Sequence, residues 1–275
     1  MKVAYWSNCR ASGVTSNLTA IGVAGVLAYP SLRITIFENH YNPNGIPNIL
    51  FPKCLAKRTA EENYSYLGGG KMEPPFLRGR KKMFFRFGDY TAVEVIKNGL
   101  YYVPVLSENP DLFDYEFNCS MVPMLEKFQA EDKIAFIDTG RKNNISSKVI
   151  LDRADLVVVT LRQNLQDIQN FFQNYSSLIP KAFFIIGNYD RKSCVNLRRI
   201  LSEFHFKREQ IGVIPHLDEF EWAANSGRII EFLASRFDQS LGGEEGYFIQ
   251  ELKRTTFLMM QHAVFDRTQE YPYEC

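Results

Sequence analysis

Seven short apolar runs are spaced along the chain, with polar or helix-like segments between most of them. Val, Ile and Phe dominate these runs, and polar residues seldom alternate with apolar ones, which is typical of strands covered on both faces of a sheet. We expect strands at 2–6 (KVAYW), 32–38 (LRITIFE), 99–105 (GLYYVPV), 133–138 (KIAFID), 154–161 (ADLVVVTL), 181–189 (KAFFIIGNY) and 211–215 (IGVIP).

Helical patterns lie between several of these runs, at about 16–29, 120–130, 164–178 and 194–206. Strands that alternate with helices predict a doubly wound α/β fold, with a mostly parallel sheet of about seven strands and helices on both faces. In such a sheet, ligands bind beyond the carboxyl ends of the strands.

Residues 42–92 interrupt this alternation. They are rich in Pro, Gly and basic residues and contain no long periodic element. We interpret them as an insertion between the second and third strands, a surface excursion with a short helix and a hairpin. The alternative is an element for partner binding or self-association, because its run RGRKKMFFRF mixes cations with aromatic rings.

The expected organisation is a domain of residues 1–240 that carries this insertion, followed by a C-terminal helical tail at 241–275. The tail's helical pattern places Phe248, Leu252, Met259 and Ala263 close to one face. Helices that lie on membranes usually have a strongly basic polar face, and this one has few cations. We therefore favour packing against the domain or a second subunit over membrane binding.

Net charge and composition argue against several partner classes. A formal net charge of +1 gives no bulk attraction to nucleic acid or to an acidic membrane, so direct binding to either is not favoured. The sequence contains no bilayer-spanning apolar run and no signal-peptide pattern. Its five cysteines and four histidines are scattered without zinc-ligand spacing. We expect a reduced, cytoplasmic protein, and any association with a membrane would be through a partner.

The first strand is followed by a polar loop and then by a helix, which is the layout of a phosphate-binding loop. Such a loop ends in Gly-Lys-Thr/Ser, but residues 9–16 read CRASGVTS, so Val14 replaces the lysine while Gly13, Thr15 and Ser16 are kept. Backbone amides at the helix start can bind phosphate whatever the side chains are. Small polar residues are also common at any helix N-terminus, so an ordinary turn is the alternative.

Polar residues stand at the ends of other expected strands. Asp138 could hold Mg²⁺ through water, and the amide of Gly140 could donate to a terminal phosphate. Glu38 ends the second strand, and Asn188 offers an amide able to hydrogen-bond a base edge. Pro215 ends the last strand. Because the carboxyl ends of parallel strands share one edge, these residues should meet there.

With these segments in this order, the sequence resembles the MinD/ParA family of deviant Walker P-loop ATPases, in particular its CpaE/TadZ-like pilus-localisation branch. The resemblance runs from residue 1 to about 237, and residues 42–92 are unmatched. It implies a P-loop NTPase-like, three-layer fold, ATP and Mg²⁺ as ligands, and a homodimer closed around nucleotide.

The resemblance also assigns roles at the site. Catalytic roles would fall on Asp138 and Glu38, and Glu38 with His40 matches an Asp-x-Asp pair of the family. Thr15 and Asp138 would hold the metal. The nucleotide-binding residues would be Arg10, Ser12, Gly13, Val14, Thr15, Ser16, Gly140, Asn188 and Pro215.

Both lysines of the family's loop are absent. Cys9 stands at the signature lysine and Val14 at the second one. Arg10 could supply one cation, in its own subunit or across a dimer. His40, in place of an aspartate, weakens the activation of water further. We expect weak or slow hydrolysis at most.

Three functions are consistent with these features. The favoured hypothesis is a degenerate homologue that acts as a nucleotide-responsive or pseudo-ATPase scaffold and localisation factor, with a protein partner such as a pilus or secretion apparatus. One alternative is an active ATPase for DNA or plasmid partitioning, with Arg10 in place of lysine. The other is a purely structural interaction domain with a vestigial nucleotide site. All three depend on analogy with the fold.

Overall fold

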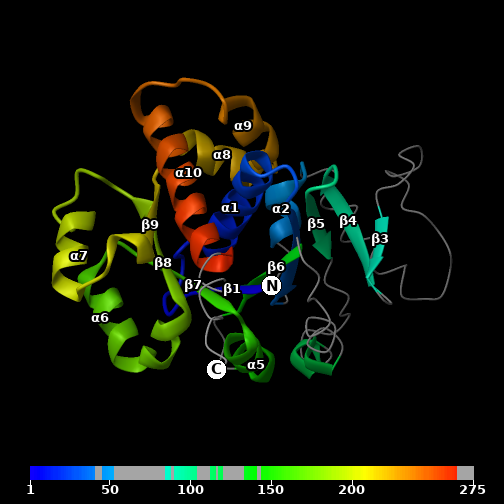
Figure 1. The fold of residues 1–275 in the computed structure, drawn as a ribbon, viewed down its shortest axis with the longest axis horizontal. Helices are drawn as coiled ribbons and strands as arrows, with labels where there is room; N and C mark the ends of the chain where they lie inside the picture. The colour runs from blue at the N-terminus through cyan, green and yellow to red at the C-terminus, as the bar shows by residue number, and fades with distance from the viewer. Residues whose placement is uncertain are drawn as a thin grey trace, which may run out of the picture.

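The computed structural model describes residues 1–40, 45–52, 84–87, 90–103, 112–115, 117–119, 133–140 and 144–264. Within these residues, nine strands form one sheet in the order β3-β4-β5-β2-β6-β1-β7-β8-β9 (Figure 1). The strands are β1 (Lys2–Trp6), β2 (Arg33–Asn39), β3 (Phe84–Phe87), β4 (Tyr90–Ile96), β5 (Leu100–Val103), β6 (Lys133–Thr139), β7 (Leu156–Leu161), β8 (Ala182–Tyr189) and β9 (Ile211–Pro215).

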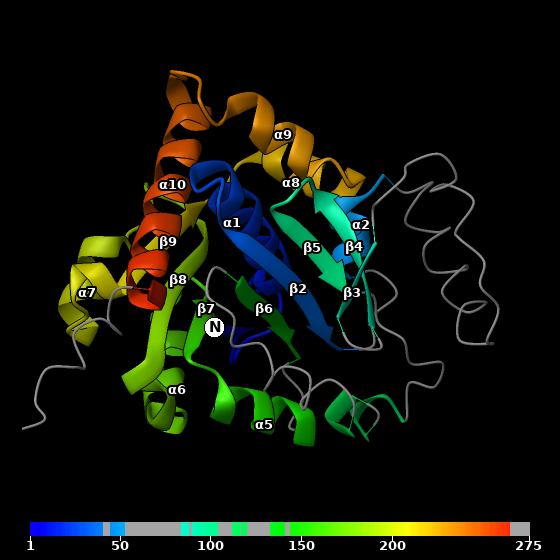
Figure 2. The same ribbon diagram turned by 45° about the vertical axis from the view of Figure 1, so that its right-hand side comes forward.

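The strands from β5 to β9 in this order pair in parallel, whereas β3 and β4 extend the sheet as an antiparallel hairpin on β5. All seven predicted strands are present, and β6 lies in the middle of the sheet between β2 and β1. The expected hairpin is present, but it extends beyond the insertion, because β3 lies inside residues 42–92 whereas β4 continues to Ile96. Figure 2 shows β2 between β5 and β6, the region in which the site described below is built.

Helices cover both faces of the sheet, as predicted (Figure 1). Five pack over one face: α1 (Val14–Ala28), α2 (Ile46–Leu50), α8 (Asp218–Ser226), α9 (Ile229–Arg236) and α10 (Gly243–Val264). Over the other face pack α5 (Ile145–Arg153), α6 (Leu165–Asn174) and α7 (Leu197–Phe204), and the described helical residues Phe113 and Phe117 are buried there too. Short 3₁₀ turns precede β8 and β9, at Ser176–Lys181 and Arg208–Gln210.

The two apolar layers receive alternate residues of each central strand. In β1, Val3 and Tyr5 pack beneath α1, while Ala4 and Trp6 pack towards α6. This is the period-2 geometry of a strand that is buried on both faces, and it explains why the strands read as continuous apolar runs.

The sequence patterns located the helices less well than the strands. The helix expected from residue 16 begins at Val14, because Gly13 ends the preceding loop in a left-handed conformation with φ of 79°. Helices α5, α8 and α9 were not predicted. The helix expected at 120–130 lies outside the described residues.

The described part of the insertion is more than a surface excursion. Helix α2 buries Ile46 and Leu50 in the core beneath α1 and α8. The cationic half of the run proposed for partner binding, residues 78–83, lies outside the described residues. The insertion therefore contributes both a core helix and a sheet-edge hairpin.

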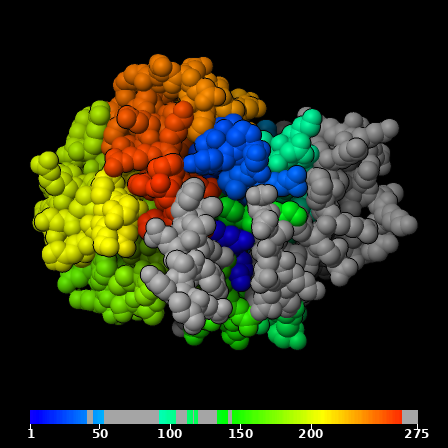
Figure 3. Space-filling model, in the orientation of Figure 1, coloured from blue at the N-terminus to red at the C-terminus, as the bar shows by residue number. Residues whose placement is uncertain are grey.

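Helix α10 packs against β9 and α1, and Figure 3 shows α10 and α1 side by side on one face. The side chains predicted to share a face, Phe248, Leu252, Met259 and Ala263, are all buried in the same core. None of the described helices is long and apolar enough to cross a membrane.

Thr255 of α10 fastens the helix to β9 through the backbone of the strand. Its hydroxyl accepts a hydrogen bond from the Val213 N–H at 3.0 Å and donates one to the Val213 carbonyl at 2.8 Å. Gly212 permits this approach, because a Cβ there would lie 2.4 Å from the Thr255 side chain. Arg208 donates to the Ile211 carbonyl at 2.9 Å, so two residues of this strand are bonded away from the sheet.

Thr255 and its neighbour provide a matched test of this attachment. Thr255→Val removes a buried hydroxyl and both hydrogen bonds, so we expect the free energy of unfolding to fall by about 1–3 kcal/mol. The Thr256 hydroxyl is buried without a hydrogen-bond partner, so Thr256→Val should be neutral or stabilising. Urea denaturation of both variants measures the difference, and equal losses would contradict this account of Thr255.

Candidate functional site

The loop between β1 and α1, residues 7–13, lies at the carboxyl end of the central strands. Gly13 occupies the N-cap position with φ of 79° and ψ of 25°, and no side chain caps the helix. The first amides of a helix have no acceptor within it. An uncapped, solvent-facing helix start is therefore available to an anion such as phosphate.

This arrangement corrects one part of the sequence interpretation. Thr15 and Ser16 were expected to mark the helix start, but they occupy its second and third positions. Val14 is the first helical residue and packs partly against the core, which accounts for an apolar side chain where a phosphate-binding loop has lysine. Arg10 is exposed, and no ion pair involves it among the described residues.

The loop packs against the end of β8 and the first turn of α6. A Cβ on Gly187 of β8 would lie 2.7 Å from the Ser12 carbonyl and 2.8 Å from Asn17 Nδ2, so only glycine allows the loop to pass here. Asn8 donates to the Asp167 carbonyl at the start of α6 at 3.0 Å. The loop conformation is thus fixed by packing that does not require a ligand.

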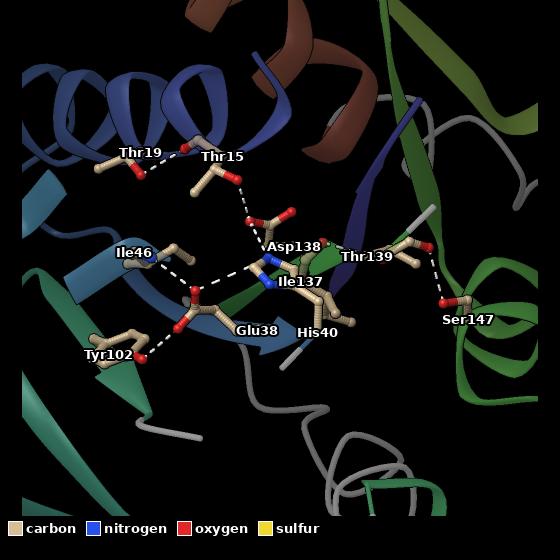
Figure 4. Close-up of polar contacts among 11 residues, drawn as sticks. Thr15, Thr19, Glu38, His40, Ile46, Tyr102, Ile137, Asp138, Thr139 and Ser147 are labelled. Atoms are coloured by element: carbon tan, nitrogen blue, oxygen red, sulfur yellow. Dashed lines mark hydrogen bonds and ion pairs between the residues drawn. The ribbon is translucent and has the colours of Figure 1, made fainter. Parts of the chain in front are cut away.

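Asp138, at the end of β6, joins the loop helix to β2 (Figure 4). Its Oδ2 accepts a hydrogen bond from the Thr15 hydroxyl at 2.7 Å and lies 2.9 Å from His40 Nε2. The Asp138 residue is 2% exposed. The predicted metal pair, Thr15 and Asp138, is therefore in direct contact, with His40 as a third member.

Glu38, near the end of β2, is equally enclosed. Its Oε1 accepts the Ile46 N–H at 2.7 Å, its Oε2 accepts the Tyr102 hydroxyl at 2.5 Å, and its Oε1 lies 4.0 Å from His40 Nε2 (Figure 4). Both oxygens are thus engaged by fixed donors from α2 and β5. This carboxylate holds α2 against the sheet. Glu38 therefore has a structural role, although the sequence suggested a catalytic one.

Burial and charge perturb this cluster in linked ways. Burial raises the pKa of Glu38 to about 7, against the opposing effects of His40, Tyr102 and the Ile46 amide. Burial lowers the pKa of His40, but the hydrogen bond with Asp138 and the charges of Asp138 and Glu38 outweigh it and raise this pKa to about 8. At neutral pH the imidazole is mostly a cation enclosed by two carboxyl groups.

The other predicted site residues flank this cluster on both sides of the loop. The Gly140 amide donates to the Asn39 carbonyl at 3.2 Å, so it already has an acceptor in the protein. Asn188 is exposed with φ of 50°, and its amide donates to Glu221 at 3.4 Å. Pro215 is buried and pairs with Tyr189 at the end of β8.

Sequence reasoning did not identify Tyr102, the Ile46 amide or Gly187 as parts of this region. Tyr102 and Ile46 reach Glu38 because β5 pairs with β2 and because α2 folds back into the core. Neither strand order nor the path of an aperiodic insertion can be read from a hydrophobic pattern. His40 was noted as a substitution, but its contact with Asp138 was not predicted.

The oxygen atoms present fit Mg²⁺, because a hydroxyl and a carboxylate are the donors this ion prefers. Thr15 and Asp138 would hold the ion, which would neutralise phosphate charge when bound. His40 competes for the same Asp138 oxygen at 2.9 Å. The residues thus allow Mg²⁺ but also place a nitrogen donor beside it.

Comparison with solved structures identifies the architecture. MinD of Pyrococcus horikoshii complexed with Mg-ADP matches with a TM-score of 0.61 and 12% identity, over 96% of this chain and 97% of that one. The chain has the MinD/ParA-type fold. The MinC:MinD complex of Aquifex aeolicus matches with a TM-score of 0.57 and 13% identity, over 100% and 98% of the two chains.

A putative plasmid partition protein of Borrelia burgdorferi bound to AMPPNP has the same MinD/ParA-type fold, with a TM-score of 0.55, 13% identity, and coverage of 94% and 98%. No protein-family model matches the sequence, and no curated protein sequence matches it. At these identities the likeness establishes the fold, as predicted, and leaves the activity to be argued from the site.

The cluster predicts a pH dependence of stability. The pKa of His40 is raised from 6.5 to about 8. Its contribution to the free energy of unfolding is therefore fully present below pH 6.5 and is lost as pH rises through 8. That difference corresponds to roughly 2 kcal/mol. The pKa of Glu38 is also raised, from 4.5 to about 7, so this residue likewise lowers the free energy of unfolding as pH rises between these two values.

His40→Gln should therefore flatten the fall in unfolding free energy above about pH 7, as measured by urea denaturation across a pH series. His216→Gln is the matched control, because that imidazole is about half exposed on the opposite side of the loop. A wild-type profile that does not fall between pH 7 and 8.5, or one that His216→Gln alters equally, would show that His40 is not held as described.

Proposed function

We propose that this chain is a degenerate MinD/ParA-like ATPase homologue that acts as a nucleotide-responsive or pseudo-ATPase scaffold and localisation factor. It would bind ATP weakly at the β1–α1 loop and hydrolyse it slowly or not at all. The observation that carries the proposal is a loop that keeps an uncapped helix start and a left-handed Gly13 but has no lysine side chain.

The charges of the site support binding without efficient turnover. Phosphate would meet backbone amides and the exposed cation Arg10 instead of two lysines. Both oxygens of Glu38 are bonded to Ile46 and Tyr102, and Asp138 is bonded to Thr15 and His40. Three of the four oxygens of these two carboxylates thus already hold hydrogen bonds, which disfavours their use as a base towards water.

A homodimer would suit this site. We place residues 7–16 and 138–146 near its interface, with Arg10 reaching phosphate in its own subunit or in the partner. The exposed side chain of Arg10 and the position of residues 7–13 and Asp138 at the carboxyl ends of the strands support this arrangement, and residues 141–143 lie outside the described residues.

We propose that a protein partner binds the exposed surface of α8 around Trp222. Trp222 is 61% exposed there, beside a groove of about 510 Å³ that also includes Arg228 and Phe232. Exposed tryptophan next to arginine is a common feature of interaction sites. A pilus or secretion apparatus is our proposal for the partner's source, by analogy with the CpaE/TadZ-like branch.

Structural neighbours support both the scaffold and its main rival. MinD of Aquifex aeolicus is described in complex with MinC, and the Borrelia protein is a putative plasmid partition protein bound to AMPPNP. An active partitioning ATPase would need turnover, and a purely structural domain would bind no nucleotide. A binding titration followed by a phosphate-release assay separates these three functions.

Restoring the missing lysine is the direct test. Val14→Lys should strengthen ATP binding by about 1–3 kcal/mol, or roughly 5- to 150-fold, because it adds a charge-assisted hydrogen bond to phosphate. The measurement is a fluorescence titration with a labelled ATP analogue. Val14→Met is the control, since it keeps an apolar side chain against the core and adds no charge.

A folded Val14→Lys variant that gains no affinity would contradict a loop shaped for phosphate. Wild-type protein that hydrolyses ATP as fast as an ordinary ATPase, about 1 s⁻¹ or more, would instead favour the partitioning alternative.

Assembly gives a second test. Sedimentation should detect more dimer when ATP is added to the wild type, and Arg10→Ala should reduce that effect because it removes the cation nearest the loop. Arg199→Ala, an exposed cation on α7, is the control. A strictly monomeric mass with and without ATP would count against the dimer.

A further inference from the structure

Three side chains near the ends of β2 and β6 converge on one point, and all three can bind metal. From this convergence we propose that Glu38, His40 and Asp138 form a site for one divalent transition-metal ion, which binds without nucleotide. The site goes beyond the proposed function, because its ligand is a free metal ion.

The distances suit a single ion. His40 Nε2 lies 2.9 Å from Asp138 Oδ2 and 4.0 Å from Glu38 Oε1, and one ligand atom from each residue lies within 4.8 Å of the others. Ligands of a four- or five-coordinate zinc ion are each roughly 2.0–2.2 Å from the metal, which puts neighbouring ligand atoms about 3–4 Å apart. A small inward shift of Glu38 would complete the set.

The ligands are already oriented by outer contacts. The Ile46 amide and the Tyr102 hydroxyl fix the two oxygens of Glu38, and the Thr15 hydroxyl fixes Asp138. Glu38 Oε1 keeps a second lone pair for a metal, and the lone pair of Asp138 Oδ2 that now faces His40 would turn to the ion. Such outer hydrogen bonds are typical of metal sites, where they set the ligand orientation and raise affinity.

The two carboxylates of the proposed site are shielded from solvent, and the imidazole is its partly exposed member. Glu38 and Asp138 are 4% and 2% exposed, whereas the His40 side chain is 22% exposed. Entry past His40 would bring the metal to two carboxylates in a low-dielectric environment, where their attraction for a cation is strong. The charge of the ion would replace that of the imidazolium now enclosed there.

The nitrogen ligand selects the kind of metal. Mg²⁺ and Ca²⁺ prefer oxygen ligands, whereas imidazole suits Zn²⁺, Co²⁺, Fe²⁺ and Ni²⁺. One imidazole and two carboxylates therefore favour a transition metal over Mg²⁺.

A second His-carboxylate cluster serves as an internal control. His216, Asp218 and Glu221 are all exposed, and both ring nitrogens of His216 face carboxylates, at 3.1 Å and 3.5 Å. It lacks the burial and the outer hydrogen bonds of the first cluster, so it should contribute little to metal binding.

The test uses the full chain, stripped with a chelator and free of nucleotide, and titrates it with Co²⁺ followed by visible absorption. We expect one equivalent to bind, Zn²⁺ to displace it, and millimolar Mg²⁺ to leave it in place. His40→Gln should weaken binding by at least about tenfold, the scale of losing one ligand or its support, while His216→Gln should have no effect.

His40→Asp provides a readout that a structural role would not produce. It makes the set all-oxygen, so preference should move from Zn²⁺ towards Mn²⁺ and Mg²⁺. No saturable Co²⁺ binding, or binding that His40→Gln leaves unchanged while circular dichroism shows both glutamine variants folded, would overturn the proposal. So would a His40→Asp variant with unaltered metal preference. Because no nucleotide is present, failure here would leave the proposed ATP binding untouched.

Discussion

One carboxylate oxygen organises the functional end of this molecule. Asp138 Oδ2 takes the Thr15 hydroxyl from α1 on one side and His40 from the chain after β2 on the other. Through these contacts the loop, the central strand β6 and the segment after β2 are held in one geometry. Because the carboxylate is buried, leaving it with neither partner would cost several kcal/mol, so its two partners are constrained to stay.

The same contact explains how a loop of this type can persist without lysine. A phosphate-binding loop normally balances the charge of its ligand with lysine, and its carboxylates with a metal ion. Here Val14 packs partly into the core, and the cation next to the carboxylates is a side chain of the protein, His40. Part of the local negative charge is therefore offset before any ligand arrives. The loop and the strand ends can therefore keep their geometry when no ligand is bound, so a nucleotide is not needed to stabilise them.

The parallel sheet could be predicted because double burial produces continuous apolar runs, as in β7 and β8. The gathering of Thr15 and Asp138 followed from the rule that parallel strands end at one edge. The rest depended on information that is not local. Tyr102 reaches Glu38 only because β5 is next to β2, and Ile46 reaches it from an insertion without periodicity. Helices α8 and α9 were missed because they are short and their apolar positions are not strongly periodic.

The attachment of α10 to β9 has a consequence for how copies of this chain can meet. An unpaired edge strand offers its backbone groups to any passing strand, and many proteins assemble by extending a sheet in this way. On β9 the outward groups of Val213 already pair with Thr255, and the Ile211 carbonyl pairs with Arg208. This edge of the sheet is therefore closed to strand addition. Sheet extension would be confined to the far edge, at β3, and any other assembly must rely on side chains at the strand ends or on helix surfaces.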